Sequence, residues 1–141
     1  MSDNPAQWLR DQLNEDERIA KRAAGRSSEW RLARPLDDEE AGDASLLRPV
    51  ELEHAERHDP ARVLREIDAK RKVIAAHATA AKRVEELTTL VARLRAEGQD
   101  DLMATMKQET AIHQRDVLHG VLCLLALPYA GRPGYREEWR L

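Results

Sequence analysis

Apolar residues recur every three or four positions between residues 60 and 97, which is the spacing of one face of an α-helix. Asp59 is a good N-cap, Pro60 suits the first helical position, and Gly98 favours a C-terminal stop. The pattern predicts one helix on the order of 50 Å long. We expect Ile67, Ile74, Val84, Leu87 and Val91 in its core or in a dimer seam. The whole apolar face is Leu64, Ile67, Ile74, Ala78, Ala81, Val84, Leu87, Val91 and Leu94.

A second periodic segment follows Asp100-Asp101, which can cap a helix, and ends at Pro128, which cannot continue one. Because only a few residues link the two segments, we expect an antiparallel helical hairpin. Two helices cannot enclose a core alone, so the N-terminal helix or a second copy of the chain must cover them. The apolar positions of this segment are Leu102, Met103, Met106, Ile112, Val117, Val121 and Leu124, thickened by Leu118, Leu122 and Leu125.

The two ends of the chain carry weaker patterns. Residues 4–7 (Asn-Pro-Ala-Gln) form a helix start, and Gly25 is a natural stop. Near the C-terminus, Pro133-Gly134 matches the central pair of a type II turn. Tyr135 and Trp139 then fall on one side of a short predicted helix. The N-terminal segment between start and stop has a broken apolar stripe of Leu9, Leu13, Ile19, Ala20 and Ala23.

These elements predict an all-α fold, with a long antiparallel helical hairpin, a shorter N-terminal helix and an aromatic C-terminal tail. The chain has 141 residues, enough for one domain with a modest core. We assign residues 1–35 to the N-terminal helix and the segment around Trp30, and 36–58 to an acidic linker in which 49–57 can form a short helix. Residues 59–128 form the predicted hairpin, and residues 129–141 form the tail.

Composition and charge narrow the protein class. Residues 36–59 hold nine acids and two arginines, a net charge of −7, whereas residues 60–97 hold nine bases and five acids, a net charge of +4. The single cysteine, Cys123, lies in an apolar run and is expected to be a buried, inert thiol. The sequence shows no signal peptide, and its longest apolar run is too short to span a bilayer. We therefore expect a cytoplasmic protein with no membrane association and no cofactor.

Two histidine patterns raise the question of a metal site. Glu51, His54 and His58 are spaced so that a helix would place them on one face, and such a set can bind zinc or non-haem iron in a metal-dependent hydrolase. Against this, Asp59-Pro60 ends that helix at His58. The dipeptide His58-Asp59 could also suggest a phosphohydrolase, but the N-cap role explains Asp59 without further ligands. The interpretation as a polar helix end is favoured.

Two surface features could bind a partner. The basic residues Lys70, Arg71, Lys72, Lys82 and Arg83 could contact a phosphate backbone, but acids interrupt them and no aromatic residue is interleaved, which favours a solvated helix face. The tail places Tyr129, Tyr135 and Trp139 near Arg136, and these residue types dominate protein interfaces. The tail is expected to dock either on its own domain or on a protein partner.

Three blocks of sequence carry a resemblance. "RHDPARVLREIDAKRKVIAAH" (57–77), "LLALPYAGRPGYREEWR" (124–140) and "LRDQLNEDERIAKRA" (9–23, followed by Trp30) resemble a family of small uncharacterised proteins of actinobacteria and their phages. Its members form a domain of unknown function, so the resemblance implies no catalytic residue and no cofactor. It implies an actinobacterial or phage origin and a cytoplasmic location. A Cys/His-containing insert precedes the "ALPYA" block in that family, and here a plain amphipathic helix occupies this region.

The function favoured by the sequence is that of a non-catalytic, helical protein-binding or regulatory module, with a protein partner or a second copy as the ligand. Two alternatives remain. A nucleic-acid-binding regulator would use the basic face of the long helix, and a metal-dependent hydrolase would use Glu51, His54 and His58.

Overall fold

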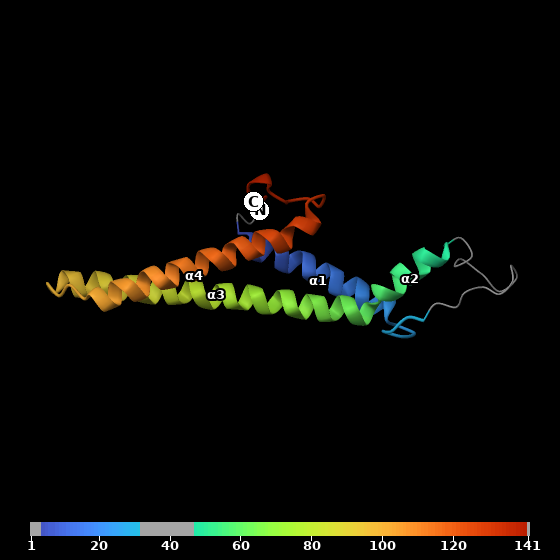
Figure 1. The fold of residues 1–141 in the computed structure, drawn as a ribbon, viewed down its shortest axis with the longest axis horizontal. Helices are drawn as coiled ribbons and strands as arrows, with labels where there is room; N and C mark the ends of the chain where they lie inside the picture. Colours follow the sequence, from blue (N-terminus) through green and yellow to red (C-terminus); the bar gives the residue numbers. More distant parts are fainter. Residues whose placement is uncertain (1–3, 32–46, 141) are drawn as a thin grey trace, which may run out of the picture. The chain divides into compact units, whose positions relative to one another are not determined.

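The computed structural model describes residues 4–31 and 47–140. No strand occurs in these two ranges, so the predicted all-α fold is confirmed. Of the predicted acidic linker at 36–58, residues 36–46 lie outside the described residues. The elements are α1 (Pro5–Ala23), α2 (Pro49–Arg57), α3 (Pro60–Ala96), α4 (Leu102–Ala126), and the 3-10 turns η2 (Leu127–Tyr129) and η3 (Glu137–Trp139) (Figure 1).

Contacts group the chain into two compact units. The hairpin unit consists of Met1–Gln12 and Ala69–Leu141, and the α2 unit consists of Leu13–Asp68. The predicted domain boundaries at residues 35, 58 and 128 remain a prediction. Within the hairpin unit, α4 runs antiparallel to the adjoining part of α3, which confirms the predicted hairpin (Figure 1).

The turn of the hairpin is built by a glycine stop and an aspartate cap. Gly98 adopts a φ of 73°, and the Gln99 amide donates to the Leu94 carbonyl at 2.9 Å. This left-handed residue and its backward hydrogen bond end α3. The Asp101 carboxylate then accepts hydrogen bonds from the amides of Met103 (2.9 Å) and Ala104 (3.2 Å) and begins α4. Both the glycine stop and the aspartate cap were predicted from the sequence.

The core of the hairpin is a seam of small and aliphatic side chains. Val84, Leu87 and Ala111 form a buried cluster, with Leu90 and Ile112 packed against it. The five core residues predicted on the long helix are all buried. One prediction on α3 was wrong, because Ala78 is exposed and Ala80 is buried. The buried positions 80, 84, 87 and 91 follow alternating steps of four and three, which leave Ala78 beside the seam.

Half of the ten apolar positions predicted on α4 lie outside the core. Leu102, Met103, Met106, Val117 and Leu124 are exposed. The inner side of α4 is rich in small residues, which allow close approach to neighbouring elements. Because α4 is apolar on two sides, periodicity alone could not show which side is buried. The buried residues of α4 are Ala104, Ala111, Leu122, Cys123 and Ala126.

The first turns of α1 supply a third layer in the hairpin unit. The Asn4 side-chain oxygen accepts a hydrogen bond from the Ala6 amide at 2.9 Å, as the predicted cap requires. Trp8 and Leu9 are buried. A hollow lined by residues of both helices, among them Gln7 and Ile74, shows that these turns lie beside α3.

The α2 unit holds the start of α3. Asp59 caps that helix, because its carboxylate accepts from the Arg62 amide at 2.8 Å. The Ala61 amide donates to the Ser28 carbonyl at 2.9 Å, which ties the segment after α1 to the first turn of α3. Leu13, Ala20, Leu52 and Ile67 are buried in this unit. Ile19, predicted on the apolar stripe, is half exposed and lines a shallow hollow with Pro60 and Val63.

Candidate functional site

Four aromatic side chains meet in the hairpin unit and form what we call the aromatic cluster: Trp8, Tyr129, Tyr135 and Trp139. Trp8 lies at its centre, with ring centroids 6.5 Å from Tyr129, 5.7 Å from Tyr135 and 5.3 Å from Trp139. The Tyr135 and Trp139 rings are 5.6 Å apart and nearly perpendicular. Edge-to-face pairs of this kind add stability beyond the buried area. The tail therefore docks on its own chain.

A tight turn brings the tail onto Trp8. The Tyr135 amide donates to the Arg132 carbonyl at 3.3 Å, and Gly134 has a φ of 84°, so the predicted type II turn at Pro133-Gly134 is confirmed. The Trp8 indole N–H donates to the Pro133 carbonyl at 3.1 Å. A Cβ added at Gly134 would lie 2.8 Å from the Trp8 Nε1 atom, so only glycine suits this position. The short helix predicted after the turn is the 3-10 turn η3, which begins at Glu137, so Tyr135 lies before it.

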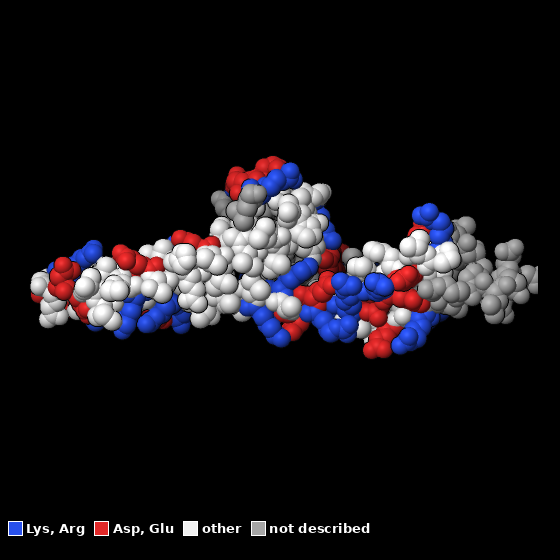
Figure 2. Space-filling model, in the orientation of Figure 1, with Lys and Arg blue, Asp and Glu red and all other residues white. Residues whose placement is uncertain are grey.

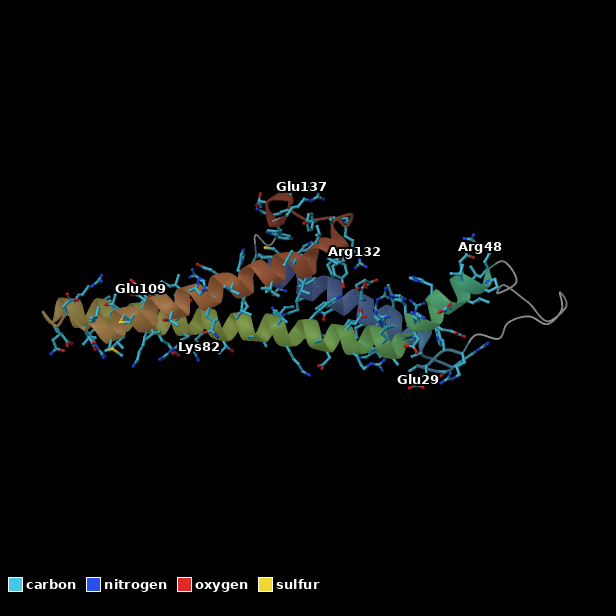
Figure 3. All side chains as sticks on the ribbon, viewed as in Figure 1. Glu29, Arg48, Lys82, Glu109, Arg132 and Glu137 are labelled. Atoms are coloured by element: carbon cyan, nitrogen blue, oxygen red, sulfur yellow. The ribbon has the colours of Figure 1, made fainter. Side chains whose placement is uncertain are left out.

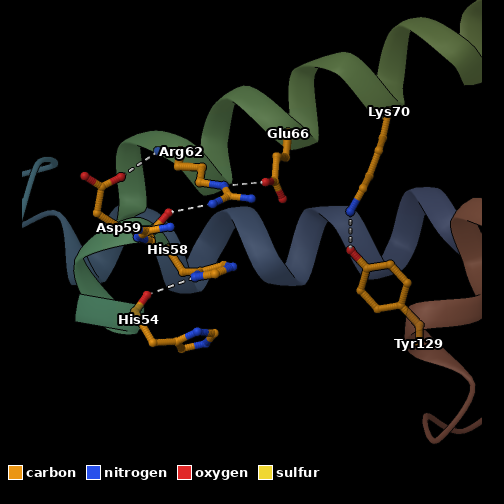
Figure 4. A network of polar contacts seen from close by, with 8 residues as sticks. His54, His58, Asp59, Arg62, Glu66, Lys70 and Tyr129 are labelled. Carbon is orange, nitrogen blue, oxygen red and sulfur yellow. Dashed lines mark hydrogen bonds and ion pairs between the residues drawn. The ribbon is translucent and has the colours of Figure 1, made fainter. Parts of the chain in front are cut away.

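Tyr129 links the tail to the helices of the hairpin unit. The Lys70 ammonium donates to the Tyr129 hydroxyl at 3.4 Å and lies 5.4 Å from its ring centroid (Figure 4). The Arg132 guanidinium lies 4.7 Å from the same centroid and donates to the Gln12 side-chain oxygen at 3.2 Å. These cation–π and hydrogen-bond contacts fix the chain as it leaves α4.

The structure gives the four predicted tail residues different surroundings. Tyr129 and Trp139 are buried in the aromatic cluster. The Tyr135 hydroxyl is buried and has no hydrogen-bond partner among the described residues. Arg136 pairs with Glu138 at 2.9 Å. The cluster is thus held by ring contacts, and its buried members anchor the tail internally. A partner-binding role for these residues remains a prediction.

A line of uncharged residues follows the outer side of α4, and we call it the α4 stripe. Its positions alternate in steps of three and four residues over the full length of the helix, which is the repeat of a coiled-coil seam. Met103, Met106, Val117 and Leu124 are 60%, 52%, 53% and 55% exposed. Exposed apolar side chains gathered along one side of a helix are typical of an interaction surface. The stripe comprises Met103, Met106, Thr110, His113, Val117, Gly120, Leu124 and Leu127.

A groove on the hairpin continues the stripe toward α3. It is lined by Leu87 from α3 and by Met103, Met106 and Ala111 from α4. Arg83 and Lys107 also line it, so the groove has an apolar floor and basic edges. Methionine side chains are flexible and polarisable, and they adapt to the shape of a bound surface. The groove widens the apolar surface near the hairpin turn.

The predicted nucleic-acid residues are partly engaged within the chain. Lys70 is held by Tyr129, and Arg83 pairs with Glu86 at 3.4 Å. On the visible face of the molecule, Lys and Arg side chains stand among Asp and Glu side chains (Figure 2). Lys82 on α3 and Glu109 on α4 both project away from the hairpin (Figure 3). The nucleic-acid role of Lys70, Arg71, Lys72, Lys82 and Arg83 remains a prediction.

The predicted metal ligands are spread along α2 in the α2 unit, with Glu51 in the first turn, His54 in the last turn and His58 at the C-cap. The His54 and His58 rings are 4.2 Å apart, but the His58 Nδ1 atom bonds to the His54 carbonyl at 2.9 Å (Figure 4). Arg48 binds the Glu51 carboxylate through its guanidinium (2.8 Å) and its backbone amide (2.7 Å), and these bonds lower the pKa of Glu51. Within residues 4–31 and 47–140, no three His, Cys, Asp or Glu side chains are grouped to hold a metal ion. These residues take part in the hydrogen bonds that cap the two ends of α2.

Two further titratable groups lie in the hairpin unit. Cys123 is a buried free thiol, as predicted, and burial raises its pKa, which keeps it protonated and unreactive. His77 on α3 faces His119 on α4, with ring centroids 5.9 Å apart. Burial lowers the pKa of His77, and the charges of His119 and Arg115 lower it further.

Sequence reasoning missed Trp8, which is the central residue of the aromatic cluster. The signal was present, because Trp8 stands one residue before the apolar Leu9 near the start of a predicted helix. A tryptophan there widens the buried face of the helix beyond the aliphatic stripe. The α4 stripe was also missed, since Met103, Met106, Val117 and Leu124 were not separated from the apolar positions that are buried.

The chain belongs to a family whose sequence description covers residues 2–141, the family of unknown function DUF6221. The predicted membership of a domain-of-unknown-function family is thereby confirmed, and the actinobacterial or phage origin remains a prediction. The chain matches neither a curated protein nor a solved structure. Among the described residues, none of the helices combines the length and the apolar character needed to cross a bilayer.

Proposed function

We propose that this protein is a non-catalytic, helical protein-binding module that docks its ligand on the α4 stripe. The observation that carries the proposal is the row of exposed apolar side chains at coiled-coil spacing, with Met103, Met106, Val117 and Leu124 each more than half exposed. A helix that is apolar on two sides buries one side in its own fold, and the other side is available for a partner.

The aromatic cluster supports this function indirectly. It fixes the C-terminal end of α4 against the first turns of α1 through Trp8, so the stripe is presented on a supported helix. A pre-organised surface loses less conformational entropy on binding than a mobile one. Tail and stripe thus have separate roles, one in anchoring and one in recognition.

The cytoplasmic location, the regulatory role and the actinobacterial or phage origin belong to this proposal as predictions from the sequence. The composition supports a helical module acting through surfaces rather than through a catalytic centre. Homodimer formation is one form that the binding can take, and it is argued separately below.

The test is photo-crosslinking in the cells that produce the protein. A photoreactive amino acid replaces Val117 on the stripe or, as a matched control, Val50 on α2, since these valines are 53% and 63% exposed. We expect a defined crosslinked protein species from position 117 and not from position 50. Absence of any crosslink at 117, or identical crosslinks at both positions, would contradict the proposed function.

A further inference from the structure

The outer side of α4 has the properties of a seam that pairs with a copy of itself. None of the eight positions of the α4 stripe holds Lys, Arg, Asp or Glu, and they keep the three-four alternation without a break from Met103 to Leu127. An unbroken repeat of 3.5 residues matches a partner helix that has the same repeat. In this chain α4 is such a helix.

The hairpin also lacks layers near its turn. There the core cluster consists of Val84, Leu87 and Ala111, with Leu90 and Ile112 beside it, and Met103 and Met106 remain exposed. Two hairpins joined along α4 would form a four-helix arrangement in which these exposed side chains become interior, as in ordinary helix bundles. The sequence prediction that a second copy could cover the hairpin points to the same occupant.

Charges beside the stripe favour one orientation of the two copies. One flank carries Leu102, Glu109 and Asp116, and the other carries Lys107, Gln114 and Val121. In a parallel, in-register pair, each residue of the first flank meets the partner residue five positions later on the second flank. This pairs Glu109 with Gln114 and Asp116 with Val121, so no like charges meet. An antiparallel pair would bring the acidic flanks together, which is unfavourable.

The size of the seam indicates its strength. The 25 residues of α4 extend about 37 Å at 1.5 Å per residue. With a width of about 10 Å, roughly one helix diameter, the footprint is on the order of 400 Å² per chain. Stable dimers bury about 800 Å² per partner, so a seam of this size suits a weaker association that depends on concentration.

We infer that the α4 stripe is the interface of a parallel homodimer, in which the stripe of one chain packs against the same residues of a second copy. This inference rests on the proposed function, because it names the protein that the stripe binds. Thr110 and His113 form a polar layer in the middle of the seam and fix its register, as isolated polar residues do in coiled coils.

The first test is sedimentation equilibrium of the full chain from about 5 μM to about 500 μM, the range in which a small interface associates. We expect a shift from monomer to dimer across this range. Val117→Glu places a charge in the apolar seam and should weaken association at least about tenfold. Val50→Glu, the same substitution at an exposed site on α2, should leave it unchanged. A monomer throughout, or a dimer that Val117→Glu does not weaken, would overturn the inference.

The second test reports orientation. In a Cys123→Ala background, Met103→Cys should form a disulfide-linked dimer under mild oxidation, because in-register parallel helices bring the two Met103 positions together. In an antiparallel pair these positions would stand about 36 Å apart, with no crosslink. A dimer without this crosslink would therefore overturn the parallel pairing.

Failure of the dimer and failure of the proposed function give different results. If the chain is monomeric and photo-crosslinking at position 117 captures a different protein, the binding function stands and the self-association is wrong. If position 117 captures nothing and the chain is monomeric, both are wrong.

Discussion

The two ends of the hairpin unit hold α4 in different ways. Where α4 runs into η2, Leu122 and Ala126 are completely buried, in the part of the unit where the first turns of α1 and the tail add further layers. Near the hairpin turn, Met103 and Met106 are 60% and 52% exposed. The same helix carries apolar residues at both ends. Even at the covered end, Leu124 on the outer side of α4 is 55% exposed, so burial depends on which layers cover each side of the helix and not on the residue type.

The largest difference in stability is expected between two leucine-to-alanine substitutions that lie two residues apart on α4. Leu122 is 0% exposed and Leu124 is 55% exposed on the same helix. Leu122→Ala removes buried methyl groups and leaves a cavity, so we expect a loss of about 2–5 kcal/mol in the free energy of unfolding. Leu124→Ala should change it by no more than about 0.5 kcal/mol. Denaturant titration at low micromolar concentration measures both, with the chain monomeric.

The contrast between the inner and the outer side of α4 would break if both leucine variants lost similar stability at low concentration. That result would mean that the outer side of α4 is already covered within one chain. A Leu124→Ala effect that appears only at high concentration would instead sharpen the comparison, because it would assign the exposed side to association.

A smaller loss of stability is expected at the turn that places the tail against Trp8. Gly134→Ala places a Cβ 2.8 Å from the Trp8 Nε1 atom and at a φ of 84°. We expect a loss of about 1–3 kcal/mol, since the residue must leave the left-handed region or displace the indole. Gly131→Ala is the matched control, because its Cβ would meet nothing within 4 Å. Thermal melts of both variants, followed by tryptophan fluorescence, measure the difference. Equal melting temperatures would show that the turn does not hold the tail.

The helix boundaries could be predicted from the sequence because local chemistry sets them. Asp59, Gly98 and Asp101 each act on backbone groups within a few residues, and each has the predicted role in the structure. The turn at Pro133-Gly134 was predictable for the same reason, since a left-handed glycine after proline defines its type. Short-range hydrogen bonds leave a signature in a short stretch of sequence.

The site could be predicted only in part, because long-range packing leaves no such signature. The tail aromatics were identified as anchors, but their docking partner Trp8 lies more than a hundred residues earlier in the chain. On α4, Val117 and Leu122 are both good core residues by type, yet one is half exposed and the other is buried. Periodicity finds the two apolar sides of α4, and only the three-dimensional arrangement shows which side its own chain covers.

The smallest expected effect lies between the two ends, where His77 faces His119 across the hairpin. Burial first, and then the charges of His119 and Arg115, lower the pKa of His77 in the folded chain. In the unfolded chain the pKa is about 6.5. As the pH falls through about 6.5, the unfolded chain binds this proton more readily than the folded chain, so the free energy of unfolding decreases. It increases again when the pH is raised.

His77→Gln should therefore flatten the pH dependence of the free energy of unfolding between about pH 7.5 and 5. An unchanged slope in His77→Gln would show that the surroundings of His77 on the hairpin do not disfavour its protonation in the folded chain.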